Sequence, residues 1–229
     1  MREYVLLQLK VRAMRDLLFR SRIFTYLAAA TPGLKELVTF GKIWELALDE
    51  RKVRSGQSYD LVVVDAPATG HGLGFLETPR TFAQIARVGP IRAHAEALDK
   101  LIRDHRRTGV AIVALPEEMP VNETAHLERE LSERIGASVD AIYLNGLYPE
   151  RFSVAESERL AELAEDGEGA VAAACRDAVR QSRRARAQRD QLGRLEELAE
   201  TPVTTLPYLF EPELGIEQVG ILADEVARA

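Results

Sequence analysis

Hydrophobic residues along the chain follow two patterns, one typical of helices and one typical of buried strands. The strand-like runs are YDLVVVD (59–65), GVAIVALP (109–116), VDAIYLNG (139–146) and TPVTTLP (201–207). Each is short, β-rich and continuous rather than alternating, as expected of strands covered on both faces. Periodic helical segments, such as 90–107 and 121–135, separate the runs. Strands that alternate with helices predict an α/β fold, a parallel sheet with flanking helices.

The N-terminal region, residues 1–56, is predicted to be helical. Residues 3–29 carry apolar residues at mixed steps of three and four, the spacing of a helix with two buried sides. Pro32 then interrupts the chain, and a second helix is predicted from there to about Arg54. Because neither a repeat nor a clear second domain follows, we interpret 1–229 as a single domain.

Residues 154–200 form a region of different composition, rich in alanine and charge and divided by Gly167 and Gly169. This composition predicts a solvated helical hairpin inserted before the fourth strand. The stretch 176–189 within it is rich in arginine, which leaves a nucleic-acid-binding arm as the less favoured alternative.

Overall composition narrows the class of protein. The chain has 30 Lys and Arg against 36 Asp and Glu, a net charge of −6, which argues against a general nucleic-acid binder. The single cysteine, Cys175, excludes a disulfide framework and a cysteine-based zinc site within one chain. No apolar run approaches the length of a membrane span, and MREYVLLQLK lacks a signal-peptide core. We therefore expect a soluble, cytoplasmic protein without direct membrane insertion.

Polar or turn-forming residues follow each of the four predicted strands. Asp65, Glu117, Asn145 and Pro207 occupy these positions. Because ligands of parallel α/β sheets bind at the carboxyl ends of the strands, all four are expected at one edge. Such residues are also common turn formers, so a structural role is the alternative at each position alone.

Asp65 ends a run of three valines and is followed by a glycine-rich turn. A carboxylate held at the end of a buried strand is suited to orienting Mg²⁺ through water, and nearby glycines let backbone N–H groups approach a phosphate. On these residues alone, a magnesium–nucleotide site and a structural turn are equally supported. The string GHGLGF lacks the glycine spacing of a dinucleotide fingerprint.

The string VVVDAPATGHGL resembles the DTAPTGHT signature of the ArsA-type anion-transporting ATPases, which include arsenical-pump and tail-anchored-protein-targeting ATPases. Asp65, Thr69, Gly70 and His71 match the signature. The positions that differ are Ala66, Pro67, Ala68 and Gly72. Further segments that resemble the family, in the same order, are TPGLKELVTFGKIWEL, GFLETPRTF, LPEEMPVNETAHLEREL, IYLNGLYPE and LPYL. The resemblance therefore covers nearly the whole chain.

The resemblance implies a P-loop NTPase-like fold and a homodimer that closes on ATP and opens after hydrolysis. It implies that Asp65 orients Mg²⁺ through water, and that Thr69 and Gly70 sense the γ-phosphate. His71 stands in the same signature, but a histidine in a turn is more often a local hydrogen-bond partner.

The same resemblance assigns the residues that meet the rest of the nucleotide. It implies that Glu117 reaches the nucleotide and that Asn145 hydrogen-bonds adenine, whose donor and acceptor edge suits a carboxamide. The loop at Pro207 is implied to cover the base.

The family's phosphate cradle, GKGGVGKT, and its switch I aspartate turn are not found in these 229 residues. We therefore expect a truncated or split chain that needs a P-loop supplied elsewhere, on a partner chain or upstream. Alone it is expected to be inactive, because the P-loop lysine and amides provide most of the phosphate stabilisation. Two alternatives stay open: a degenerate, non-hydrolysing nucleotide-binding or regulatory module, and a helical protein-interaction scaffold.

The residues exclude one class of cargo and leave another open. A single cysteine excludes arsenite capture by three thiolates of one chain. The helical region 1–56 is left as a candidate face for a protein cargo or a membrane-protein partner.

Overall fold

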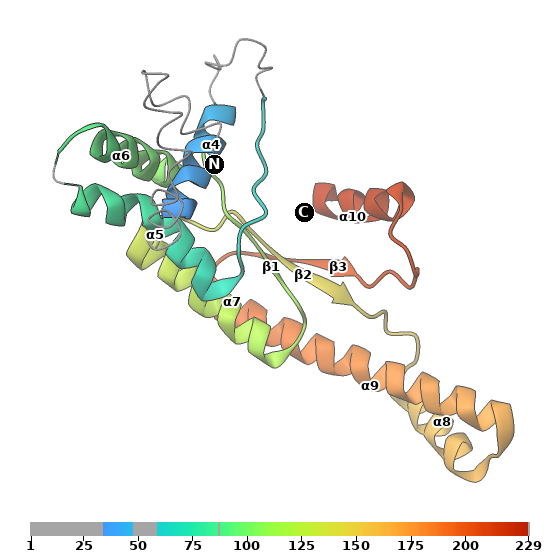
Figure 1. Ribbon diagram of the computed structural model, residues 1–229. Helices are drawn as coiled ribbons and strands as arrows, with labels where there is room; N and C mark the ends of the chain where they lie inside the picture. Colours follow the sequence, from blue (N-terminus) through green and yellow to red (C-terminus); the bar gives the residue numbers. More distant parts are fainter. Residues whose placement is uncertain (1–33, 48–58, 87, 229) are drawn as a thin grey trace, which may run out of the picture. The chain divides into compact units, whose positions relative to one another are not determined.

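The computed structural model describes residues 34–47, 59–86 and 88–228 (Figure 1). Its contacts divide the chain into two compact units, one of residues up to 108 with 135–137 and the other of 109–134 and 138–229. The predicted helix at 3–29 lies outside the described residues. None of the helices in the described ranges has both the length and the apolar character needed to cross a membrane.

The first unit contains three helices, α4 (Leu34–Leu46), α5 (Thr69–Ile85) and α6 (Pro90–Arg103). Their shared core is made by buried apolar side chains from all three helices, including Leu37, Phe40, Leu73, Phe75, Leu98 and Ile102. Phe40 and Phe75 stack with their ring centroids 4.2 Å apart, which joins α4 to α5. The helical prediction is thus met at 34–46, and its continuation towards Arg54 lies outside the described residues.

The first predicted strand, at 59–65, is wrong, because the segment 59–68 does not form a strand. These residues have no regular secondary structure, and Leu61 and Val63 are 77% and 83% exposed. The run YDLVVVD is apolar enough for a buried strand, but it pairs with no other strand in the described part of the chain. Apolar character alone does not form a strand when a neighbour for its backbone groups is missing.

The second unit contains the sheet. Its strands are β1 (Ala111–Ala114), β2 (Ala141–Leu147) and β3 (Val203–Pro207), in the spatial order β1-β2-β3 and all parallel (Figure 1). Ile142 and Leu144 of the central strand are fully buried, as expected of a strand with neighbours on both sides. The predicted α/β fold with a parallel sheet is confirmed.

Helices connect and flank these strands. They are α7 (Glu118–Glu130), the one-turn π-helix Leu131–Ile135, α8 (Val154–Asp166), α9 (Gly169–Leu198) and α10 (Ile216–Arg228). The predicted hairpin is the α8–α9 pair, drawn in orange in Figure 1. Its two helices approach closely through small residues, and the hydroxyls of Ser157 and Ser182 share a buried hydrogen bond of 2.7 Å.

Candidate functional site

The carboxyl edge of the sheet brings together three of the predicted site residues. Asn145 comes directly after Leu144, whose register partner on β1 is Ala114, and Glu117 follows Ala114 by three residues. Pro207 ends β3, where it is the register partner of Leu147. Because all three strands are parallel, Glu117, Asn145 and Pro207 lie at the same edge.

The chain leaves β2 through a β-bulge next to Asn145. The register shifts between Asn145 and Leu147, which leaves Gly146 as the extra residue. Gly146 has φ of 84°, a backbone conformation that side chains with a Cβ rarely adopt. The backbone N–H of Tyr208 donates to the carbonyl oxygen of Leu147 at 2.8 Å and closes the edge beyond the bulge. Bulges of this kind turn side chains out of the regular sheet, here at the predicted base-reading residue.

The Asn145 carboxamide is half-buried, and no other described residue hydrogen-bonds to it. Its oxygen accepts and its NH₂ group donates, so it can satisfy both kinds of group on the edge of a purine. Glu117 is exposed at the N-cap of α7, and its side chain makes no capping hydrogen bond. Both side chains therefore have their polar atoms available to a ligand.

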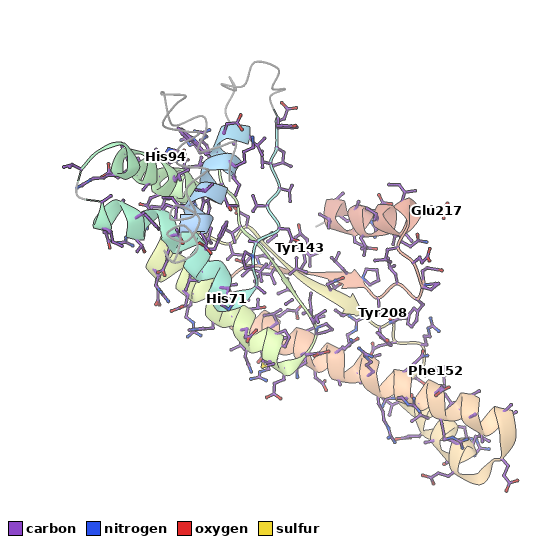
Figure 2. The ribbon with its side chains drawn as sticks, in the orientation of Figure 1. His71, His94, Tyr143, Phe152, Tyr208 and Glu217 are labelled. Atoms are coloured by element: carbon purple, nitrogen blue, oxygen red, sulfur yellow. The ribbon has the colours of Figure 1, made fainter. Side chains whose placement is uncertain are left out.

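An aromatic cluster lies beside this edge and was missed by the sequence analysis. Tyr148 and Tyr208 lie with ring centroids 4.6 Å apart, and Phe210 is edge-on to both of them. The guanidinium of Arg184 lies 4.6 Å from the Tyr148 ring centroid, and that of Arg151 lies 4.8 Å from the ring of Phe210. The signal that could have indicated the cluster is the position of the tyrosines, just after Asn145 and Pro207. Figure 2 labels Tyr208, which directly follows the last residue of β3.

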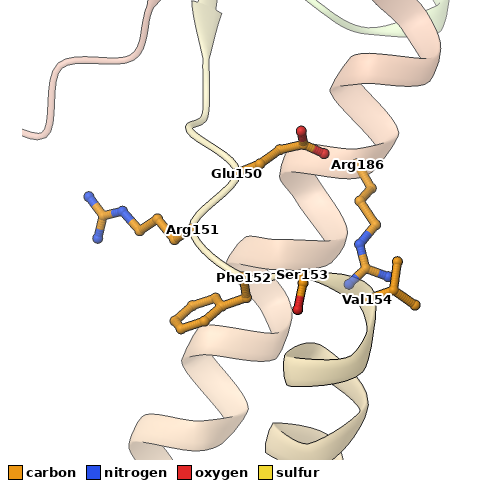
Figure 3. A pocket seen from close by; sticks show the side chains of 6 residues that line it. All are labelled: Glu150, Arg151, Phe152, Ser153, Val154 and Arg186. Atoms are coloured by element: carbon orange, nitrogen blue, oxygen red, sulfur yellow. The ribbon is translucent and has the colours of Figure 1, made fainter.

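A pocket of about 430 Å³ opens next to this cluster, at the N-terminus of α8. Its lining residues are Glu150, Arg151, Phe152, Ser153, Val154 and Arg186 (Figure 3). The Ser153 hydroxyl accepts the N–H of Glu156, and the Glu156 carboxylate accepts the N–H of Ser153 in return. These hydrogen bonds lower the pKa of Glu156, which fits its role as a capping carboxylate. None of the predicted site residues lines this pocket.

The first unit holds Asp65, Thr69 and Gly70. Asp65 is exposed in the extended segment 59–68, four residues before α5. Thr69 and Gly70 are the first two residues of α5, and the first helical hydrogen bond there runs from Gly72 N–H to Ala68 O. The prediction of a glycine-rich loop after Asp65 is therefore wrong, because the glycines lie at the start of helix α5. The N–H groups that precede Gly72 in the first turn of α5 have no partner within the helix and point outward from its end.

Metal ligands are sparse in the part of the chain that the structure describes. It contains no group of three or more His, Cys, Asp or Glu side chains that could hold a metal ion directly. Mg²⁺ in nucleotide sites commonly takes one or two carboxylates, with water and phosphate oxygens as its remaining ligands. An exposed single carboxylate such as Asp65 fits that kind of site, whereas a site built from protein ligands alone does not fit.

The chain matches the anion-transporting ATPase family (ArsA-type) over residues 8–91 and 85–166. These two matches together span more than half of the sequence. The chain belongs to this family. Membership relates it to ATPases in general, in agreement with the resemblance seen in the signature around Asp65.

Individual relatives agree with this family. ATPase BagA of Mycobacterium tuberculosis is 35% identical over 124 residues, which cover 53% of this chain and 34% of BagA. A putative arsenical pump-driving ATPase of Aquifex aeolicus is 28% identical over 145 residues, covering 52% of this chain and 46% of the relative. ATPase GET3 of Candida glabrata is 24% identical over 148 residues, covering 53% and 42%. The matches thus span between a third and a half of these ArsA-type relatives.

Proposed function

We propose that this chain is the nucleotide-binding part of an ArsA-type ATPase, which binds ATP with Mg²⁺ and hydrolyses ATP when a P-loop is supplied from outside these 229 residues. The observation that carries the proposal is the Asn145 carboxamide. It has no partner among the described residues, stands at the carboxyl edge of a parallel sheet, and belongs to a chain of an ATPase family.

Each predicted site residue has a role in this proposal. Asn145 hydrogen-bonds the adenine, and the loop at Pro207 covers the base. Glu117 approaches the nucleotide from the N-cap of α7. These roles are supported by the position of all three residues at one edge of the sheet.

In the first unit, Asp65 holds Mg²⁺ through water, and Thr69 and Gly70 meet the γ-phosphate. Backbone N–H groups at a helix N-terminus favour a negatively charged group, which supports this role for the start of α5. Mg²⁺, when bound, neutralises charge on the phosphate oxygens.

The outer edge of β1 supports a P-loop supplied from elsewhere. Among the described strands, β1 pairs with β2 alone, and its outer backbone groups have no strand beside them. Val113 is 64% exposed on this strand. A further parallel strand added here would end at the same edge as Glu117 and Asn145, so a glycine-rich loop following it would place its N–H groups near the nucleotide.

The proposal extends to partners and location. We propose that the protein acts in the cytoplasm as a homodimer or together with a P-loop-bearing chain. A protein cargo or a membrane-protein partner is proposed for the region 1–56, and 1–229 is proposed to form one ArsA-type domain when complemented. Family membership supports an ATPase-related role in general.

The test is complementation. The full chain is co-expressed with a strand–GKGGVGKT–helix segment, and Mg²⁺-dependent ATP hydrolysis is measured for the chain alone, for the pair, and for the pair with the P-loop lysine changed to alanine. We expect background hydrolysis in the first and third samples and turnover in the second. Asp65→Asn in the pair is expected to lower turnover.

Two outcomes would contradict the proposal. Turnover by the purified chain alone, abolished by Asp65→Ala, would show that a phosphate cradle exists within these residues. A pair that forms a stable complex and binds ATP without hydrolysing it would instead favour a degenerate regulatory module.

A further inference from the structure

One side chain of α9 holds the backbone that directly follows Asn145. The Nε2 of Gln188 donates to the carbonyl oxygen of Gly146 at 3.3 Å, and its Oε1 accepts the backbone N–H of Tyr148 at 2.8 Å. Gln188 is only 5% exposed, although it lies within the arginine-rich stretch that was predicted to be solvated. The Gln188 carboxamide therefore pairs with a backbone acceptor just before Leu147 and with a backbone donor just after it.

The bulge explains why this side chain is needed. A regular strand would pair these backbone groups with a neighbouring strand, but β1 pairs with β2 only as far as Leu144, and the register with β3 shifts at Gly146. The carboxamide has the same donor and acceptor groups as a peptide unit, so Gln188 replaces the missing strand partner. A buried backbone group without such a partner would be costly, so the bulge and the glutamine stabilise each other.

A second side chain, one turn earlier on the same face of α9, supports this arrangement. The Arg184 guanidinium covers the ring of Tyr148, which in turn lies against Tyr208. The Tyr208 ring approaches Gly146, since a Cβ built on that glycine would lie 3.9 Å from Tyr208 Cδ2. The segments that leave β2 and β3 are thus fastened to each other and to α9.

We propose that Gln188 is a positioning residue, which fixes the bulge at Gly146 and thereby aims the Asn145 carboxamide at an adenine base. This inference rests on the proposed function, because it needs Asn145 to read the base. It adds that α9 of the charged hairpin belongs to the base site through Gln188. Loosening the bulge lets Asn145 sample other orientations, and the base then loses hydrogen bonds that depend on one orientation.

The experiment measures the binding of adenosine to the full chain by NMR titration. Adenosine carries the base without phosphates, so its binding does not need the P-loop. The variants are Gln188→Met, Asn145→Ala and the double variant. Methionine keeps the length and burial of the side chain and removes both hydrogen bonds. Gln181→Met is the matched control, since Gln181 is exposed on the same helix.

We expect Gln188→Met to weaken adenosine binding roughly fivefold to tenfold, the effect of about one hydrogen bond. The control should bind like the wild type, and Gln188→Met should add nothing further in the Asn145→Ala background. Faster hydrogen exchange at the Tyr148 amide should accompany the loss and show that the bulge has loosened.

Three results would overturn the inference. The first is wild-type affinity in Gln188→Met, and the second is an equal loss with and without Asn145. The third is a wild type that does not bind adenosine at all, which overturns the proposed function as well. That case is recognised because hydrogen exchange at the Tyr148 amide is still faster in Gln188→Met than in the wild type, although neither protein binds adenosine.

Discussion

The carboxylate of Glu128, on α7, accepts the backbone N–H of Thr201 at 2.8 Å, two residues before β3 begins. Its other oxygen accepts the N–H of Glu200 at 3.0 Å, and the Thr201 hydroxyl donates to the carbonyl of Val139. The entry into β3 is thereby fixed to α7 and to the segment before β2. Since Tyr208 holds the far end of β3 against Leu147, the register that places Pro207 beside Leu147 is secured at both ends.

Glu128→Ala is expected to lower the stability of the second unit by about 2–4 kcal/mol, because two backbone N–H groups lose a charged acceptor that is itself buried. Glu128→Gln should cost less, since one amide oxygen still accepts while the NH₂ group faces a donor. The free energy of unfolding in urea, followed by circular dichroism, measures both changes. Glu123→Ala, at an exposed position of the same helix, is the control. A Glu128→Ala variant as stable as this control would show that the hydrogen bonds contribute nothing.

Two glycines of the second unit should respond to alanine with opposite signs. Gly146→Ala places a Cβ on a residue with φ of 84° and is expected to destabilise by about 1–2 kcal/mol. Gly193→Ala lies inside α9, where a Cβ would meet nothing within 4 Å, and is expected to stabilise by about 0.5–1 kcal/mol. Urea unfolding of both variants measures whether each substitution lowers or raises the free energy of unfolding. A neutral Gly146→Ala would mean that the bulge is not strained by a side chain.

The strand predictions show what an apolar pattern can and cannot establish. The runs at 109–116, 139–146 and 201–207 form strands because each finds a parallel neighbour among the described residues. The run at 59–65 is also apolar and β-rich but forms none. Composition shows that a segment favours burial, whereas pairing depends on a second segment, and no property of the run itself indicates whether that partner is present.

The site shows the same division between local and long-range information. Asn145 and Glu117 could be predicted because the ends of parallel strands share an edge. Gln188 could not, because its two hydrogen bonds join residues 40 and 42 positions apart in the sequence. The glycines from Gly70 to Gly74 favour a turn by intrinsic propensity, at about 1 kcal/mol each, but Leu73 and Phe75 are buried and hold the segment as a helix.

Gly72 is expected to be the glycine of α5 that does not tolerate a side chain. A Cβ there would lie 2.5 Å from the carbonyl oxygen of Pro67, a backbone atom that cannot rotate away. We expect Gly72→Ala to destabilise the first unit by about 1–3 kcal/mol, as overpacking does elsewhere. Gly74→Ala meets nothing within 4 Å and should stabilise the helix slightly. Thermal unfolding compares the two, and equal melting temperatures would show that the close approach to Pro67 is not kept in solution.

The stability of the first unit should depend on pH through His94, which lies edge-on to Trp44 with centroids 5.1 Å apart. Burial lowers the pKa of His94 from its ordinary value of 6.5, so the folded protein binds this proton less readily than the unfolded chain. Its contribution to stability is therefore complete above pH 6.5 and declines as the pH falls from 6.5 through the lowered folded pKa. Trp44 is the single tryptophan of the chain, so its fluorescence during urea unfolding, between about pH 8 and about pH 5, reports this window. His94→Phe keeps an aromatic ring against Trp44 and should flatten the decline, and a variant with the wild-type pH dependence would assign the effect to other groups.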